Sequence, residues 1–165
     1  MPLLGGFKAS GLGELAAIVF GVLVTAFSEE ALYRGVVWRA LYPTGVMRTA
    51  VITALLFGVV HVVKPIVFGG SAGQAIQLVI ATTCGGFTYS ALRHRTASIW
   101  PPMLFHFVFD VVSDTATPHN VPYLLVVMAV LVTLGFAAYG MFLLRNARVR
   151  ADGGLTSLQQ PAHVT

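Results

Sequence analysis

Five long apolar runs follow one another along the chain, separated by short segments that carry charged or turn-forming residues. The runs cover residues 12–41, 47–63, 73–92, 98–113 and 121–144. A helix needs about 20 mainly apolar residues to cross a bilayer, and none of the runs shows the period-two alternation of a strand. The pattern therefore predicts an all-α fold, a polytopic transmembrane helical bundle with about five spanning helices.

Turn-forming and charged residues mark the predicted helix ends. Pro43-Thr44-Gly45 follows the first run, Lys64-Pro65 the second and Arg93-His94-Arg95 the third, and proline and glycine in particular interrupt helices. Residues 1–150 are therefore predicted to form one transmembrane domain. The polar residues 151–165 are predicted to be a disordered tail.

Composition supports a membrane protein. Hydrophobic residues make up 56% of the chain and charged residues 10%, whereas a soluble globular domain carries about 25% charged residues. So few charges cannot cover a water-facing surface, and the lipid bilayer is the expected surrounding. The net charge of +4 does not indicate a nucleic-acid partner, because the basic residues fall between the apolar runs. The sequence does not determine the oligomeric state.

Positive charge collects on one side of the predicted bundle. The loops near residues 39–48 and 93–97 and the end of the last helix share that side, and Lys8 and Lys64 lie on the other. Cytoplasmic loops are enriched in lysine and arginine, so we expect a multi-pass protein of the cell membrane with the arginine-rich loops and the C-terminus in the cytoplasm. The N-terminus is then outside, which is unusual without a preceding segment, and we expect either a minimal protein or one that lacks helices found upstream in longer relatives. The arginines concerned are Arg39, Arg48, Arg93, Arg95, Arg145, Arg148 and Arg150.

Two adjacent carboxylates, Glu29 and Glu30, lie inside the first apolar run, and Arg34 follows Glu30 by four residues. A charge inside a bilayer costs about 2.5–3.5 kcal/mol on insertion scales, so carboxylates there are usually paired or functional. Residues four apart share a helix face, and Glu30 and Arg34 are therefore predicted to form a structural pair. Glu29 is turned by about 100° from Glu30, which leaves its carboxylate for another role.

The second and fourth runs also contain ionisable residues. His61 follows Phe57 by four residues, and His106 precedes Asp110 by four. Because His106 and Asp110 share one helix face, both side chains can point to the same neighbour. A single histidine in a membrane helix is as often a packing residue as a catalyst, so the argument depends on how these groups combine.

The depths of these residues in the membrane can be compared from their distances to the helix ends. At about 1.5 Å per residue, Glu29 lies roughly 15 Å from Arg39, and His106 lies roughly 16 Å from Arg95. His61 is deeper by about one helical turn, which helix tilt can absorb. Three helices are therefore predicted to bring four groups into one polar cluster: Glu29, His61, His106 and Asp110.

These motifs resemble the three signatures of the CAAX-protease and bacteriocin-processing family of intramembrane peptidases. The motifs are Glu29-Glu30-x-x-x-Arg34, Phe57-x-x-x-His61 and His106-x-x-x-Asp110, in the family's order and within residues 14–115. The resemblance implies an intramembrane endopeptidase that hydrolyses peptide bonds of membrane-associated peptides or proteins. Many relatives have asparagine where this chain has Asp110, and we interpret the aspartate as an accepted variant.

The resemblance also implies a role for each residue. Glu29 would be the general base for a water that His61 helps to hold, and His106, with Asp110 beside it, would stabilise the oxyanion. Glu30 and Arg34 would give structural support. The preferred mechanism uses no cofactor. A metalloprotease would use the same four catalytic residues as ligands of Zn²⁺, and the sequence does not separate the two mechanisms.

Two other functions use the same features. A non-catalytic membrane protein of this fold, such as a bacteriocin immunity or scaffold protein, would be indicated by lost catalytic residues, whereas all the positions are filled here. A transporter would show discontinuous or duplicated helices, and the sequence has no internal repeat. The favoured interpretation is an endopeptidase that a peptide or protein substrate reaches from the cytoplasmic face.

Overall fold

The computed structural model describes residues 11–115 and 122–157, and within these ranges the secondary structure is entirely helical. The elements are α1 (Leu12–Glu30), η1 (Ala31–Val37), α2 (Trp38–Leu41), η2 (Tyr42–Thr44), α3 (Val46–Val60), α4 (Val63–Val67), α5 (Ala72–Thr96), α6 (Trp100–Thr115) and α7 (Pro122–Ser157). The predicted all-α class is confirmed.

Four stretches of the described chain are long and apolar enough to cross a membrane, namely Leu12–Thr44, Val46–Val67, Ala72–Thr96 and Val126–Arg145. The fifth predicted helix is α6, which has only 16 residues and is therefore about 24 Å long. A bundle of about five helices is thus confirmed, with α6 shorter than the roughly 30 Å of a bilayer's hydrocarbon core.

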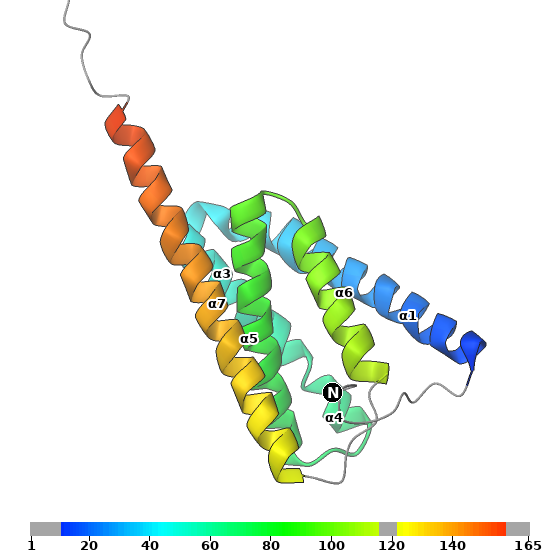
Figure 1. Ribbon diagram of the computed structural model, residues 1–165. Coiled ribbons are helices and arrows are strands. Elements are labelled where there is room, and N and C mark those ends of the chain that lie inside the picture. The colour runs from blue at the N-terminus through cyan, green and yellow to red at the C-terminus, as the bar shows by residue number, and fades with distance from the viewer. Residues whose placement is uncertain (1–10, 116–121, 158–165) are drawn as a thin grey trace, which may run out of the picture.

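The central helix is α5, which packs against α3 and α7 and also contacts α6. Helix α1 packs mainly against α6 and runs obliquely to the other long helices, as Figure 1 shows. Trp38, Ala50, Ala91 and Leu144 form one buried hydrophobic cluster. This cluster places the arginine-bearing ends of α2, α3, α5 and α7 together at one end of the bundle, as the alternation of helices predicted.

The first predicted helix is continuous but changes its geometry. Directly after Glu29 and Glu30 the chain forms the π-helical segment η1 before it returns to α-helix at Trp38. Nothing in the sequence pattern predicted this change. π-Helical turns are rare and occur frequently at functional sites, and this one lies between the paired glutamates and the arginine-rich loop.

Two predicted helix ends are wrong. The second helix ends at Val60, earlier than expected, and Lys64 and Pro65 lie in the first turn of α4, where proline's missing N–H costs nothing. The third helix continues through Arg93-His94-Arg95 to Thr96, because cations are favourable near a helix C-terminus. Ala97 ends it in a left-handed conformation with φ of 54°.

The last helix also differs from the expectation. Helix α7 runs from Pro122 to Ser157, past the predicted end at residue 144 and into the segment predicted to be a disordered tail. Residues 158–165, which complete that predicted tail, lie outside the described residues.

The α5–α7 interface depends on close approach at Gly140. A Cβ there would lie 2.8 Å from Phe87 Cδ1 and 3.1 Å from Thr88 Cα. Next to this contact the Thr88 hydroxyl donates a hydrogen bond to the Phe136 carbonyl. Small residues that let helix backbones approach closely are typical of membrane helix interfaces.

We expect Gly140→Ala to destabilise the protein by about 1–3 kcal/mol, the usual cost of overpacking a tight contact. The matched control is Gly135→Ala on the same helix, since a Cβ at Gly135 meets nothing within 4 Å. The measurement is the unfolding midpoint in detergent for both variants. Equal midpoints for the two would contradict the close packing described here.

Candidate active site

The structure brings together the four side chains that the sequence predicted to converge. Glu29 lies near the end of α1, His61 directly follows α3, and His106 and Asp110 lie one turn apart on α6. Glu29 Oε2 is 3.8 Å from His106 Nε2 and 4.0 Å from His61 Nε2. The distance from His106 Nε2 to Asp110 Oδ2 is 3.2 Å. Three helices therefore contribute to one cluster.

His106 is the centre of this cluster. Its Nδ1 lies 3.1 Å from Glu30 Oε1, and its Nε2 faces Asp110. Both ring nitrogens can donate only if both carry a proton. The ring also stacks on Tyr89, with centroids 5.0 Å apart, and meets the edge of Phe57 at 5.6 Å. Contacts on both edges and on one face leave His106 little freedom to turn.

The predicted Glu30–Arg34 pair is present and has no exposure to solvent. Arg34 Nη1 donates to Glu30 Oε1 at 2.9 Å, and Nη2 donates to the Gly86 carbonyl at 2.7 Å. The guanidinium lies 4.5 Å from the ring centroid of Phe57, within the range of a cation–π interaction. Because Glu30 also lies beside His106, the pair does more than support the first helix. Glu30 also fixes the position of the Nδ1 edge of the His106 imidazole.

The small residues of α5 have two uses. A Cβ at Gly86 would lie 2.9 Å from Phe57 Cδ1 and 3.1 Å from Arg34 Nη2, so only glycine leaves room for the buried arginine. Gly85 and Thr82 instead line the cavity described below. The sequence had favoured close packing over a groove wall for this stretch, and the structure contains both.

The break after α3 orients His61. Its backbone N–H donates to the Gly58 carbonyl, one residue short of the α-helical partner. The Phe57 carbonyl is thereby available to His61 Nδ1, which lies 2.7 Å away. A carbonyl only accepts, so Nδ1 carries the proton. In the neutral imidazole, Nε2 is then an acceptor that points toward Glu29.

Glu29 Oε2 is buried, and none of the described side chains donates a hydrogen bond to it. Across a gap of 4.0 Å it faces His61 Nε2, which is also an acceptor in the tautomer given above. Two acceptors cannot bond to each other, and buried polar atoms usually find a partner. The pair therefore suits a small molecule that can donate two hydrogens.

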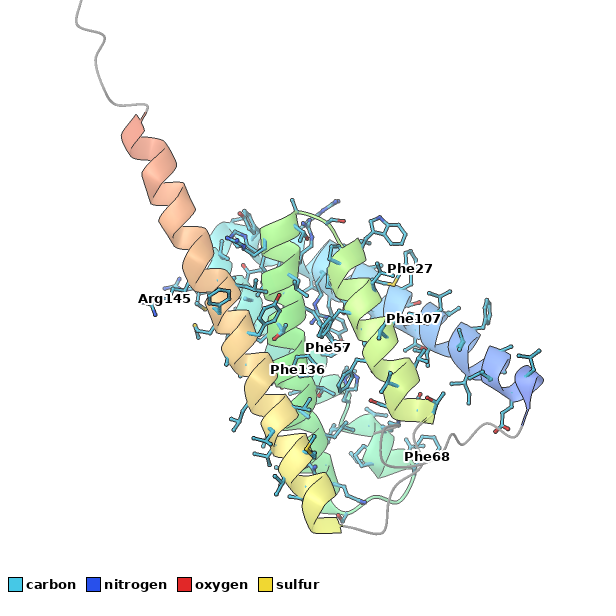
Figure 2. The ribbon with its side chains drawn as sticks, in the orientation of Figure 1. Phe27, Phe57, Phe68, Phe107, Phe136 and Arg145 are labelled. Atoms are coloured by element: carbon cyan, nitrogen blue, oxygen red, sulfur yellow. The ribbon has the colours of Figure 1, made fainter. Side chains whose placement is uncertain are left out.

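A cavity of about 1100 Å³ extends from this cluster through one half of the bundle. Figure 2 shows Phe57 and Phe136 projecting between the helices that enclose it. Most of its walls lie on the half of the bundle away from the arginine-rich end, whereas the sequence analysis expected entry from the arginine side. Representative lining residues are Ala17, Thr25, Leu78, Thr82, Ser113 and Thr133.

Sequence reasoning missed Tyr89. This residue is 3% exposed, stacks on His106, lies 5.2 Å from the Arg34 guanidinium and lines the cavity. A single tyrosine in an apolar helix carries no spacing signal. Its position next to the cluster follows only from how α5 packs.

The fit of a metal ion can be judged from the donor atoms. Within residues 11–115 and 122–157, no three His, Cys, Asp or Glu side chains are arranged to hold a metal ion together. Both nitrogens of His106 already face carboxylates. If a metal is used, the side chains that would hold it are those of the cluster, Glu29, His61, His106 and Asp110.

Comparison with known proteins places the chain in a family. The model of the family described as "Type II CAAX prenyl endopeptidase Rce1-like" matches residues 11–112, and this range includes the whole cluster. The chain belongs to the Rce1-like family. It is therefore a multi-pass membrane protein, and the resemblance inferred from the three motifs is confirmed.

A curated relative gives a second comparison. Over 94 residues the chain is 27% identical to the "Putative membrane peptidase YdiL" of Bacillus subtilis (strain 168), which covers 56% of this chain and 34% of that protein. The chain thus spans about one third of the length of that relative. No solved structure matches the chain.

Access to the cavity can be tested by thiol labelling in a Cys84→Ala background, which removes the single cysteine. Ser113 lines the cavity, and Thr96 lies at the arginine-rich end of α5. We expect a membrane-impermeant maleimide to label Ser113→Cys and Thr96→Cys from opposite faces in right-side-out and inverted vesicles. Labelling of both from the same face would contradict the cavity's direction.

Proposed function

We propose that this chain is an intramembrane endopeptidase that hydrolyses peptide bonds of membrane-associated peptides or proteins with a water activated by Glu29 and His61. The observation that carries the proposal is the facing pair of acceptors, Glu29 Oε2 and His61 Nε2, at 4.0 Å. A water between them would donate one hydrogen to each. Family membership supports the same class of reaction.

In the proposed first step, Glu29 takes a proton from the water while the water oxygen attacks the carbonyl carbon of the scissile bond. His61 holds the water through its second hydrogen. The proton on Glu29 is later given to the leaving amine, so that the carboxylate is regenerated. The position of the Glu29 carboxylate matters most here, because a general base must first lie within reach of the proton that it takes.

The oxyanion of the tetrahedral intermediate would be stabilised by His106. Its Nε2 is 3.8 Å from Glu29 Oε2, close enough to serve the same carbonyl group. Preorganised donors of this kind are often the largest single contribution to catalysis. An ionised Asp110 cannot donate to an oxyanion, so its role is to position the ring. The one Nε2 proton, which faces Asp110 here, would be shared between Asp110 and the oxyanion once the substrate is bound. The Glu30–Arg34 pair positions the opposite edge.

The substrate would enter through the large cavity. With the arginine-rich loops in the cytoplasm, the cavity lies in the outer half of the membrane. Its walls combine apolar side chains with threonine hydroxyls from α1, α5 and α7. Such walls suit an apolar peptide segment whose backbone groups still need hydrogen-bond partners.

One feature of the fold is shared with transporters. The break between α3 and α4 makes a discontinuous helix, and such helices often form ion sites. Here the freed carbonyl is taken by the His61 ring, which favours the hydrolytic proposal. A non-catalytic scaffold protein would make no use of this arrangement.

The deciding experiment compares wild type with Glu29→Gln in detergent on peptides derived from membrane proteins. We expect cleavage to fall by about 10²–10⁴-fold, because the amide cannot accept the water's proton. The matched control is Glu14→Gln, which makes the same change at an exposed position outside the cavity. Cleavage by Glu29→Gln at the control rate would overturn the proposal.

The same assay separates the two mechanisms. On the metal-free proposal, strong chelators leave the rate unchanged. Loss of activity with a chelator, followed by recovery with Zn²⁺, would decide for a metalloprotease. Absence of cleavage by wild type across membrane-derived and bacteriocin-like peptides would favour the non-catalytic alternatives.

A second prediction concerns Asp110. Asp110→Asn keeps an oxygen that accepts from His106 and adds an amide donor, so we expect it to cleave at least as fast as wild type. Asp110→Ala removes the acceptor, and its kcat should fall roughly 10–150-fold, since a hydrogen bond to a charged group contributes about 1.5–3 kcal/mol. The measurement is kcat for both variants. Equal loss in both would show that the carboxylate's charge is needed.

A further inference from the structure

A second, smaller cavity lies at the arginine-rich end of the bundle. Its volume is about 250 Å³, and it shares no lining residue with the active-site cavity. The segment Trp38–Tyr42 forms one side, and the end of α5 forms the other. Its lining residues are Trp38, Arg39, Tyr42, Arg93, His94 and Ala97.

Three rings form an aromatic cup in this cavity. The centroids of Trp38 and Tyr42 are 6.0 Å apart, and His94 lies 6.3 Å from Trp38 and 6.5 Å from Tyr42. Trp38 is 3% exposed and is anchored in the hydrophobic cluster with Ala50 and Ala91. Tryptophan and tyrosine are enriched at membrane–water interfaces, so the cup is placed where lipid headgroups lie.

Two arginines share this cavity without a carboxylate. Among the side chains that the structure describes, no acidic group lies within 4.0 Å of Arg39 or Arg93. Arg93 is oriented by its Nε, which donates to the Arg34 carbonyl at 3.1 Å. The C-terminus of α5 supplies only about half a negative charge. The pocket therefore retains a net positive charge.

We propose that this pocket binds the phosphate of an anionic membrane lipid. Guanidinium groups match phosphate oxygens in geometry and charge, and basic pockets between membrane helices are suited to anionic headgroups. The general excess of arginine on this side does not account for the arrangement, because Arg48 lies on the same side, is exposed and lines neither of the two cavities described above. The position at the ends of two spanning stretches favours a lipid over a soluble phosphate.

Occupancy of the pocket would also bear on the active site. Arg93 joins the end of α5 to the carbonyl of Arg34, and Arg34 in turn holds Glu30. A bound phosphate would hold Arg93 in this position and strengthen the contact between α5 and η1.

The test uses Trp38 as a reporter. The chain has two tryptophans, so in a Trp100→Phe background all tryptophan fluorescence comes from Trp38 in the pocket. In neutral detergent, we expect short-chain phosphatidylglycerol to change the fluorescence of Trp38 saturably, and phosphatidylcholine to leave it unchanged. Arg39→Gln should weaken the apparent affinity about fivefold, the equivalent of about 1 kcal/mol for one basic residue near a membrane surface. Arg39→Lys should restore most of it.

The matched control is Arg48→Gln, which removes the same charge on the same side. It should change the affinity less than about twofold if binding is local to the pocket. Equal weakening by Arg48→Gln, or an equal response to phosphatidylcholine, would overturn the proposal. Inorganic phosphate that saturates the signal at the same concentration would identify a soluble anion in place of a lipid.

A second measurement does not depend on the Trp100→Phe background. Wild type and Arg39→Gln are equilibrated with an equal mixture of phosphatidylglycerol and phosphatidylcholine, and retained lipids are counted by native mass spectrometry. We expect wild type to retain one more phosphatidylglycerol than the variant. Identical retention would contradict a specific site. Neither measurement uses peptide cleavage, so the result is independent of the proposed peptidase activity.

Discussion

Glu30 accepts a hydrogen bond from Arg34 and lies beside His106, and these contacts join the end of α1 to α6. The carboxylate and the guanidinium are both fully buried, so neither can be removed without leaving the other uncompensated. Breaking a buried ion pair in this way typically costs about 3–5 kcal/mol. The arrangement of the candidate active site follows from this constraint, because Arg34 also reaches the α5 backbone at Gly86.

The position of each neighbouring group can be traced to that anchor. Gly86 leaves the space that the guanidinium occupies, and Phe57 and Tyr89 cover the guanidinium with their rings. The same two rings contact His106, so packing and polar contacts agree on one orientation. Glu30 Oε2 and Arg34 Nε are buried without a hydrogen-bond partner among the described residues, so the orientation depends on Glu30 Oε1, the two Nη groups and the ring contacts. Glu29, one residue earlier, is left as the carboxylate that faces the cavity.

The two ends of the bundle differ in chemical character. One half contains a wide cavity bounded by apolar residues, threonines and the acid–imidazole cluster. The other end has a compact hydrophobic cluster beneath a basic aromatic pocket. The segment between them is the π-helical turn η1, whose Arg34 takes part in both the active-site anchor and the contact with Arg93. A change at either end can therefore be transmitted through a few direct contacts.

The sequence by itself determined the membrane setting, the number of helices, the pairing of Glu30 with Arg34 and the family. These follow from local patterns. The length of an apolar run shows whether a helix can cross the membrane, and the cost of a buried charge restricts where Glu, His and Arg can occur. It did not determine the π-helical turn, the break that orients His61, the place of Tyr89 or the direction of the cavity. The π-helical turn and the break after α3 are local changes in backbone hydrogen bonding that no spacing rule marks. The place of Tyr89 and the direction of the cavity depend on contacts between residues far apart in the chain. Tertiary packing alone decided which residues of α5 lie beside the cluster and which half of the bundle was left open.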